Sequence, residues 1–384
     1  MRDVAVTGVA QTDHARRRDD ASFEELVFEV SNGAVEDAGL QTEDIDAVVI
    51  ASGPTYFTGV NHPEKWLLEA AGGAGKPVHR ITAGGATGAY GAVAAYHHVI
   101  SGQYDNVLAV AYDKMSEGET QYAISTLYDP NFGRDFAVGI MTNAATLATA
   151  RMAAYDYTPE QAAQVVVKNR KNGMANPHAH QAGEYTIEDV IESPPVVEPF
   201  HLHDCPPVSD GACAMVLSGG DEAESLRDNP AWVQAAETCT EGYNSGDREL
   251  HPPVSAKLAA EQAYEHAEIT NPLRQLDVAE IYESYSYEEM MIYERLGLCE
   301  EGEGGRLVEE GVTQLDGELP VNPSGGVLCA NPIGATAMIR MAEAALQVMG
   351  EAGDRQLPDV AQSLGHSYGG WDNHHSVMIF GDNR

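Results

Sequence analysis

The chain has 384 residues, 43% of them apolar, and its 59 acidic against 22 basic side chains give a formal net charge of −37 at pH 7. That length predicts two or three domain-sized units, or two large halves that share a core. So negative a surface excludes nucleic acid and anionic membrane as natural partners. The acidic residues are spread along the chain, which favours a protein of a salt-rich cytosol over an unusually acidic protein of ordinary salinity.

The five cysteines predict neither a disulfide framework nor a zinc site, because their number is odd and no CxxC spacing occurs. The stretch HLHDC (201–205) lacks a second group of ligands, so we expect no bound metal. The first twenty residues hold only a short apolar run that charge soon follows, unlike a signal peptide. No apolar run approaches the roughly 18 residues of a membrane span. We therefore expect a cytoplasmic protein.

The first part of the chain alternates apolar, β-rich runs with alanine-rich helical runs. The predicted elements are a strand at 3–10, a helix at 22–40, a strand at 45–52, a helix at 88–103 and a strand at 106–113. This alternation indicates an α/β fold with a parallel or mixed sheet.

A longer segment, 117–200, follows and is too rich in Tyr, His, Met and Pro to be a linker. We interpret it as an excursion that folds over a site. The same segment contains a dense basic run, VKNRKNG, which holds Lys168, Arg170 and Lys171. These cations are candidate contacts for a phosphate, and the alternative is a solvated helix face.

The second part of the chain resembles the first. A predicted strand at 276–286 and a predicted helix at 331–350 match the earlier pattern. Both of the paired helices begin with Gly-Ala-Thr, at 85–87 and at 334–336. We therefore predict a duplicated α/β unit, with halves at 1–222 and 223–384.

The two glycine-rich turns are the first candidate site. Helix N-termini favour anions and developing oxyanions, so Gly84 and Gly85 could present backbone amides to a ligand. The alternative is that these glycines serve only tight turns and close helix packing. Two matched turns favour a site.

Tyrosines and one histidine supply the candidate side chains. Tyr282 and Tyr285 follow the predicted strand, where ligands of α/β sheets usually bind, although aromatic residues also fill cores. His366 comes after an apolar run, at a predicted strand end beside the glycines at Gly369 and 370. That position makes His366 the best general acid or base candidate, against the alternative of a structural histidine.

Several stretches resemble the thiolase superfamily, and most closely the sterol-carrier-protein-type (SCP-x) thiolases. They are AYDKMSE, NRKNGMANPHAHQ, DCPPVSDGACAMVLS, YERLGLCEEGEGGRLVEEG, LPVNPSGGVLCANPIGATA and EAALQVMGEAGDRQLPDVAQSLGHSYGG. The resemblance implies a five-layered αβαβα fold of two pseudo-symmetric halves with mixed sheets. It also implies a homodimer or dimer of dimers and acyl-CoA chemistry in a tunnel between the halves, with the CoA thioester as substrate and no further cofactor.

The resemblance also assigns roles to residues, and three of the four catalytic loops depart from the family pattern. The turn that carries the nucleophilic cysteine in thiolases has Gly85 here. The Gly-His-Pro turn has Asn331 followed by proline, and the Asn-Glu-Ala-Phe segment reads Tyr282-Glu-Ser-Tyr285. Only His366 matches its catalytic counterpart. A glycine cannot form the thiolate that accepts an acyl group.

Three hypotheses follow. The first is an aldol or retro-aldol enzyme acting on a CoA thioester without an acyl-enzyme, in which Tyr282 or Tyr285 handles the β-hydroxyl while His366 and Asn331 polarise the carbonyl. Thiolase-like aldolases of this kind work with a small partner that carries an OB-fold and a zinc ribbon. The second hypothesis is an acetyl-CoA acyltransferase with a relocated nucleophile, Cys329. The third is a non-catalytic subunit that binds acyl-CoA.

Overall fold

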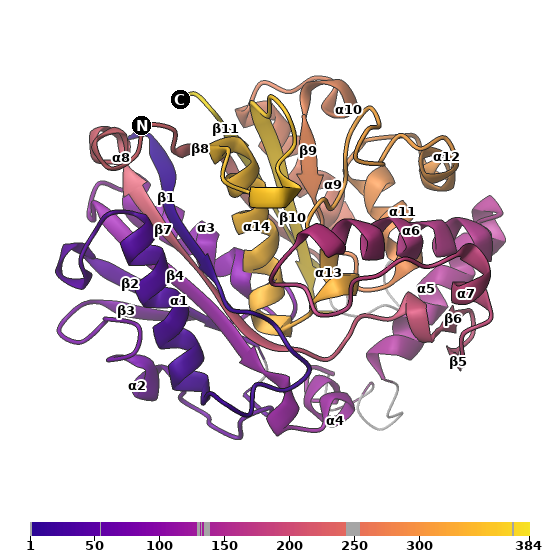
Figure 1. The fold of residues 1–384 in the computed structure, drawn as a ribbon, viewed down its shortest axis with the longest axis horizontal. Coiled ribbons are helices and arrows are strands. Elements are labelled where there is room, and N and C mark those ends of the chain that lie inside the picture. The colour runs from indigo at the N-terminus through magenta and orange to yellow at the C-terminus, as the bar shows by residue number, and fades with distance from the viewer. Residues whose placement is uncertain are drawn as a thin grey trace.

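One mixed sheet organises the molecule (Figure 1). The computed structural model describes residues 2–53, 55–128, 131, 133, 139–242, 254–370 and 372–384. Within these residues nine strands run in the order β3-β2-β4-β7-β1-β8-β11-β10-β9. They are β1 (Val4–Gln11), β2 (Ala47–Ser52), β3 (Val78–Ile81), β4 (Asn106–Lys114), β7 (Asp210–Gly219), β8 (Ala231–Thr240), β9 (Val278–Glu280), β10 (Gln362–Gly369) and β11 (His374–Gly381).

The sheet is mixed in both of its parts. β2 pairs in parallel with β3 and β4, and β9 pairs in parallel with β10, whereas the other ladders are antiparallel. A short pairing of β1 with β8, at Ala5↔Trp232 and Val6↔Ala231, joins the two parts. Strand β4 and strand β7 are buried along their whole length, as expected of strands covered on both faces.

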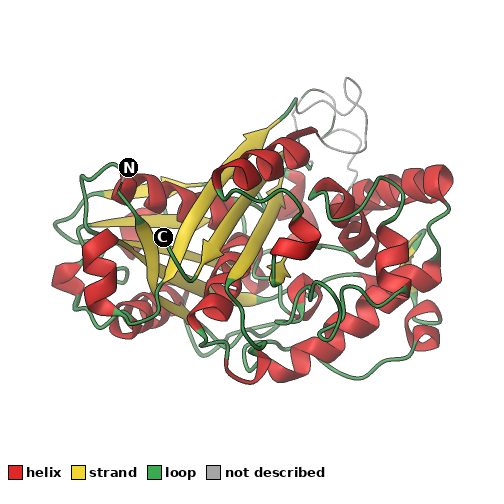
Figure 2. Cartoon of the chain, turned by 90° about the horizontal axis from the view of Figure 1, so that it is seen from above, coloured by secondary structure: helices red, strands yellow, loops and turns green. Residues whose placement is uncertain are grey.

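Two helices lie between the two parts of the sheet, and others cover the outside. α3 (Thr87–Ile100) and α14 (Ile333–Met349) pack against each other, and α14 contacts β4 and β7 as well as β10 and β9. α1 (Phe23–Asp37) covers the outer face of β1 and β7, and α9 (Val254–His266) covers β8 and β11. Figure 2 shows helices on more than one side of the strands. The predicted five-layered αβαβα fold with mixed sheets is confirmed.

Small residues allow the two central helices to approach closely. A Cβ atom on Gly88 would lie 2.5 Å from the backbone nitrogen of Met338. Both helices are buried over most of their length, although their sequences are rich in alanine rather than in bulky side chains. The crossing of α3 and α14 therefore places their N-terminal turns in one region of the molecule.

The predicted elements of the first part are confirmed to within a few residues. The helix predicted at 22–40 is α1, which begins with a capping box between Ser22 and Glu25. It ends before Gly39, whose φ of +72° an L side chain rarely adopts. The strand predicted at 276–286 is shorter in the structure, because β9 stops at Glu280 and the tyrosines that follow lie in a loop and in the start of α11.

The segment 117–200 packs at the side of the molecule away from α1 and α2 (Figure 1). Its residues 129, 130, 132 and 134–138 lie outside the described ranges. Its elements are α4 (Thr120–Ser125), α5 (Ile140–Tyr155), α6 (Pro159–Asn172), α7 (Ile187–Ile191), β5 (Pro195–Val197) and β6 (Phe200–His201). Both α5 and α6 contact α11 (Ser286–Arg295). The boundary near residue 222 stays a prediction.

The remaining helices are short. They are α2 (Glu64–Leu67), α8 (Gly220–Leu226), α10 (Pro272–Gln275), α12 (Gly304–Glu309) and α13 (Gly326–Cys329). None of the described helices is both long enough and apolar enough to cross a membrane.

Candidate active site

The first glycine-rich turn, Ala83 to Ala86, is a tight backbone turn with no side chain beyond a methyl group. Gly84 has a φ of +61°, which favours glycine. The hydroxyl of Thr87 donates to the carbonyl of Gly84 (2.6 Å) and accepts from the backbone N–H of Ala83 (2.8 Å). The first residue of α3 therefore closes the turn that precedes it.

Tyr282 and the end of β10 occupy the space beside Gly85. A Cβ atom on Gly85 would lie 3.2 Å from the hydroxyl oxygen of Tyr282 and 2.9 Å from the carbonyl oxygen of Tyr368. A Cβ atom on Gly369 would lie 2.4 Å from the backbone nitrogen of Ala86. A side chain at either glycine would therefore collide with the backbone, and the Tyr282 hydroxyl would be in tight contact with the Cβ atom of residue 85.

The second turn carries a polar side chain. The backbone N–H of Asn331 donates to the hydroxyl of Ser209 (2.9 Å), and the hydroxyl of Thr336 donates to Asn331 Oδ1 (2.9 Å). Because its oxygen is the acceptor in this contact, the amide group of Asn331 is held in one orientation. The carboxylate of Asp113 accepts from the backbone N–H of Gly334, in the first turn of α14.

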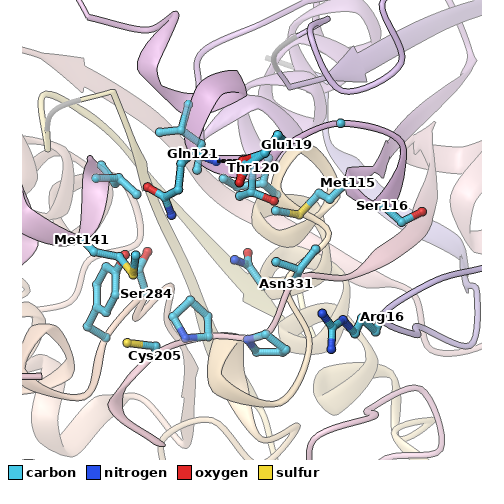
Figure 3. Close-up of a pocket in the computed structure, with 18 of the residues that line it drawn as sticks. Arg16, Met115, Ser116, Glu119, Thr120, Gln121, Met141, Cys205, Ser284 and Asn331 are labelled. Atoms are coloured by element: carbon cyan, nitrogen blue, oxygen red, sulfur yellow. Dashed lines mark hydrogen bonds between the residues drawn. The ribbon is translucent and has the colours of Figure 1, made fainter. Parts of the chain in front are cut away.

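Tyr282, Ser284, Tyr285 and Asn331 all line one cavity of about 780 Å³. Figure 3 shows Asn331 near its middle, with Ser284 on one wall and Arg16 on another. Segment 117–200 supplies part of the lining, including Gly118, Glu119, Thr120, Gln121, Ile124, Ile140, Met141 and Val196. A volume of this size is typical of pockets for small molecules.

Burial raises the pKa values of the acids around this cavity. Burial and the nearby carboxylates of Glu288 and Asp113 raise the pKa of Tyr282 above its usual range. Burial raises the pKa of Asp113 to about 8 and that of Glu288 to about 7. Burial also raises the pKa of Tyr285 well above its usual value. Near neutral pH the two tyrosines and Asp113 are therefore hydrogen-bond donors, whereas both the neutral and the ionised form of Glu288 are populated.

His366 lies inside β10 and not at a strand end, which corrects that expectation. β10 continues to Gly369 because Ser367, Tyr368 and Gly369 all pair with β11. The ring of His366 is fully buried, with its Nε2 3.3 Å from Nδ1 of His375. Burial holds its pKa well below the usual value, so the ring is neutral. Among the described residues that line the cavity, His366 does not occur; its catalytic role stays a prediction.

The two cysteines nearest the site have thiols of low acidity. Cys329 is buried, and its thiol donates to the carbonyl of Asn169 (3.3 Å) rather than facing the described lining of the cavity. Cys205 does line the cavity. Burial raises the pKa of each thiol to about 12. Neither thiol carries the appreciable thiolate fraction that a nucleophile needs at neutral pH.

The basic run of α6 faces inward. The ammonium of Lys168 is buried and contacts Glu289 (2.5 Å), and the guanidinium of Arg170 donates to the carbonyl of Gln181 (2.7 Å). Lys171 is exposed. Two of the three cations thus have structural partners within the protein, and the role of all three in binding CoA stays a prediction.

The sequence interpretation missed several groups that the fold brings to the cavity. Arg16 and Arg17 line its mouth, and Ser284 lines its wall. Behind Ser284, the hydroxyl of Tyr368 contacts Ser284 Oγ (2.8 Å) and Glu288 Oε2 (2.5 Å). The polar run YESYSYEE was the available signal, because eight consecutive positions with hydroxyls or carboxyls are unusual in a buried segment.

Family models match both parts of the chain. The model described as "Thiolase, N-terminal domain" matches residues 4–193, and the model described as "Thiolase C-terminal domain-like" matches residues 236–382.

Related proteins agree with this match. An acetyl-CoA acetyltransferase of Methanothermobacter thermautotrophicus is 35% identical, over 99% of this chain and 100% of its own length. Sterol carrier protein 2 of Homo sapiens is 28% identical, over 96% of this chain and 70% of its own length. The solved structure of the Ltp2-ChsH2(DUF35) aldolase has a TM-score of 0.86 at 26% identity, covering 100% of this chain and 98% of that one. The chain therefore belongs to the thiolase superfamily and is SCP-x-like.

Proposed function

We propose that this protein makes or breaks a C–C bond in a CoA thioester by an aldol or retro-aldol step, without a cysteine acyl-enzyme. The observation that carries this proposal is the contact at the first turn. Residue 85, which the resemblance to thiolases puts at the position of the nucleophile, is glycine, and the hydroxyl of Tyr282 lies 3.2 Å from where its Cβ atom would be. A neutral donor takes the place of a thiolate, which suits proton transfer rather than acyl transfer.

The cavity holds what a retro-aldol step needs. Such a step removes the proton of a β-hydroxyl, breaks the Cα–Cβ bond and stabilises the resulting thioester enolate by hydrogen bonds. Tyr282 and Asn331 line the same cavity. Tyr282 lies beside the first turn and Asn331 lies in the second, so both can contact one substrate. The Ltp2-ChsH2(DUF35) protein, whose structure has a TM-score of 0.86 with this chain, is an aldolase, which agrees with this chemistry.

Acyl transfer is the second candidate, favoured by the name of the Methanothermobacter relative. It needs a thiolate, and the described cysteines near the site, Cys329 and Cys205, have pKa values raised to about 12 by burial. A non-catalytic acyl-CoA-binding subunit is the third candidate. The enclosed set of neutral acids favours an enzyme over a scaffold.

We propose that Arg16 and Arg17 receive the phosphates of CoA. Both line the mouth of the cavity in a chain of net charge −37, where a local positive charge is needed to attract a polyanion. Arg17 also contacts Asp19 (3.1 Å) at the surface. We further propose a homodimer in a salt-rich cytoplasm. A small partner subunit is proposed by analogy with the Ltp2-ChsH2(DUF35) pair.

The test is cleavage of a panel of 3-hydroxyacyl-CoA esters in high-potassium buffer by the wild type and by Tyr282→Phe. We expect kcat to fall by about 10² to 10³ in the variant, the usual loss when a hydrogen-bond donor to the developing oxyanion is removed. Tyr287→Phe is the matched control. Tyr287 is a buried tyrosine of the same segment that packs on Phe200. It is not among the described residues that line the cavity.

Intact-protein mass spectrometry of the same samples separates the three candidates. Binding of the esters without an added acyl mass, together with cleavage, supports the aldolase. An acyl group on Cys329 or Cys205 would restore the acyltransferase. Binding with neither cleavage nor an adduct, with or without a co-purified partner, would leave the scaffold.

A further inference from the structure

A chain of hydrogen bonds leads from the cavity wall to a buried carboxyl group. Ser284 lines the cavity, and its Oγ lies 2.8 Å from the hydroxyl of Tyr368. The same hydroxyl lies 2.5 Å from Oε2 of Glu288, which is buried in α11. The groups come from the loop after β9, from β10 and from α11, so the tertiary fold, and no local sequence motif, assembles the chain.

The hydrogen bonds of this chain can point in only one direction when Glu288 is ionised. A tyrosine hydroxyl has one proton to donate, and the shorter contact to the carboxylate takes it. Tyr368 then has only a lone pair left for Ser284, so Ser284 donates to Tyr368. Ser284 Oγ is in turn left as an acceptor that faces the cavity. Its backbone N–H also donates to Glu288 Oε2 (3.2 Å), which fixes the residue in place.

The carboxyl group is the member of this chain that can hold the proton. Burial and the carboxylate of Glu288 raise the pKa of Tyr368 well above its usual range, so it does not persist as a phenolate. Burial raises the pKa of Glu288 to about 7, so both of its forms are populated near neutral pH. The titratable and charged groups that face Glu288 are Tyr282, Tyr285, Tyr368, Asp372 and Arg295.

The neighbouring ion pair keeps Glu288 available. Arg295 and Glu288 both lie on α11. Among the described residues, however, the guanidinium of Arg295 pairs with Asp372 (2.8 Å) and not with Glu288. Glu288 therefore has hydroxyl and amide partners, whereas the other buried glutamate of this helix, Glu289, is paired with Lys168 (2.5 Å). A carboxylate without a paired cation stays basic enough to accept a proton.

We propose that Glu288 stores the proton taken from the substrate hydroxyl, and that Ser284 and Tyr368 carry the proton to it. This inference rests on the proposed retro-aldol function. The β-hydroxyl proton moves to Ser284 while the serine proton moves to Tyr368 and the tyrosine proton to Glu288. The Cα–Cβ bond breaks, the β-oxygen becomes a carbonyl, and the bonding electron pair enters the thioester enolate. The enolate takes a proton at Cα from water, and the proton returned by Glu288 neutralises the hydroxide.

The experiment is the pH profile of kcat for 3-hydroxyacyl-CoA cleavage in the wild type and in Glu288→Gln. In the wild type we expect kcat to rise with pH through about 7, as Glu288 ionises. Glu288→Gln should lose this limb and about 100-fold or more of kcat, with KM little changed. Glu294→Gln is the matched control. Glu294 lies on the same helix, burial also raises its pKa to about 7, and it is bound by Tyr157 and Arg151 instead of the cavity groups.

Two further measurements distinguish a specific loss of catalysis in Glu288→Gln from a folding defect of that variant. Ser284→Ala and Tyr368→Phe should each lower kcat while Glu288 stays in place, at melting temperatures close to that of the wild type. The infrared band of a protonated carboxyl group should titrate near pH 7 in substrate-free wild type and disappear in Glu288→Gln.

The outcomes separate this inference from the proposed function. Cleavage by the wild type together with an unchanged pH limb in Glu288→Gln would overturn the proton store and leave the aldolase in place. No cleavage by the wild type would overturn the function, and the infrared titration would then decide only whether Glu288 exchanges its proton near neutral pH.

Discussion

The two Gly-Ala-Thr turns have the same sequence, but their threonine hydroxyls make different hydrogen bonds. In the first, the hydroxyl of Thr87 closes its own turn through the backbone of Gly84. In the second, the hydroxyl of Thr336 holds the side chain of Asn331 (2.9 Å). Gly85 in the first turn faces a tyrosine hydroxyl, whereas Gly334 in the second faces the carboxylate of Asp113. The same Gly-Ala-Thr sequence therefore orders a turn without polar side chains at the start of α3, and it orients the side-chain amide of Asn331 at the start of α14.

This difference bears on which half of the sequence supplies the reacting groups of the proposed reaction. The side chains that line the cavity near the turns, Tyr282, Ser284 and Asn331, all come from the second half of the sequence. The first turn supplies the N-terminus of α3, which favours a developing negative charge. A duplicated fold can thus keep both helix N-termini and change which half provides the reacting groups.

The largest expected effect in this comparison is that of Asn331→Ala. Loss of an oxyanion donor typically lowers kcat by about 10² to 10³. Asn229→Ala is the matched control, since Asn229 donates to the carbonyl of Val348 at the other end of α14 (2.9 Å). The measurement is kcat for 3-hydroxyacyl-CoA cleavage. If Asn331→Ala slowed the reaction no more than Asn229→Ala does, the second turn would have no catalytic part.

Much of the scaffold follows from the sequence. Runs such as NVLAVAYD predict buried strands, and the Ser22–Glu25 spacing predicts the start of α1, because these signals depend on neighbouring residues alone. The glycine turns, Tyr282 and Asn331 could also be found, since they stand at ends of elements. The structure places all of them around one region.

The groups that could not be predicted depend on tertiary contacts. Lys168 and Arg170 have the sequence of a solvated helix face, but α6 turns them inward, where Glu289 and the carbonyl of Gln181 receive them. Charged residues are so rarely buried that no sequence pattern would place them there. The contact of Tyr368 with Glu288 joins residues 80 positions apart, beyond the reach of any local signal.

A side chain at the first turn should cost stability. Gly85→Cys would place a Cβ atom 2.9 Å from the carbonyl oxygen of Tyr368, and overpacking of this kind lowers the free energy of unfolding by about 1–3 kcal/mol. Denaturant unfolding in high-potassium buffer measures the loss. Gly242→Cys is the control, because no heavy atom of the described residues lies within 4 Å of a Cβ atom at that position.

The same variant tests whether the first turn still supports acyl transfer. We expect no acyl group on Gly85→Cys after incubation with acyl-CoA, because the Tyr282 hydroxyl and the Tyr368 carbonyl oxygen crowd the Cβ atom of residue 85 at 3.2 and 2.9 Å. In the double variant Gly85→Cys, Tyr282→Ala the two losses of stability should sum to less than additivity predicts, because removal of the ring relieves part of the crowding at residue 85. A Gly85→Cys variant as stable as the wild type and readily acylated would mean that the turn kept its thiolase geometry.

The smallest expected effect concerns the carboxyl group under the second turn. Burial raises the pKa of Asp113 to about 8 from an ordinary value of 3.8, against the opposing hydrogen bonds from Gly334 and Gly53. A raised pKa means that the folded state binds a proton that the unfolded state releases. The stabilisation is complete below about pH 4 and is lost as the pH rises through about 8.

Asp113→Asn keeps an acceptor for the N–H of Gly334 and removes the titration. The free energy of unfolding should then fall less steeply between pH 5 and 7, by about 1 kcal/mol per pH unit. Asp316→Asn, at an exposed position, should leave the slope unchanged. An equal slope in Asp113→Asn would mean that Asp113 is ionised and neutralises the N-terminus of α14. The shallower slope would mean that a neutral acid lies there, which leaves the positive end of the helix for the substrate oxygen beside Asn331.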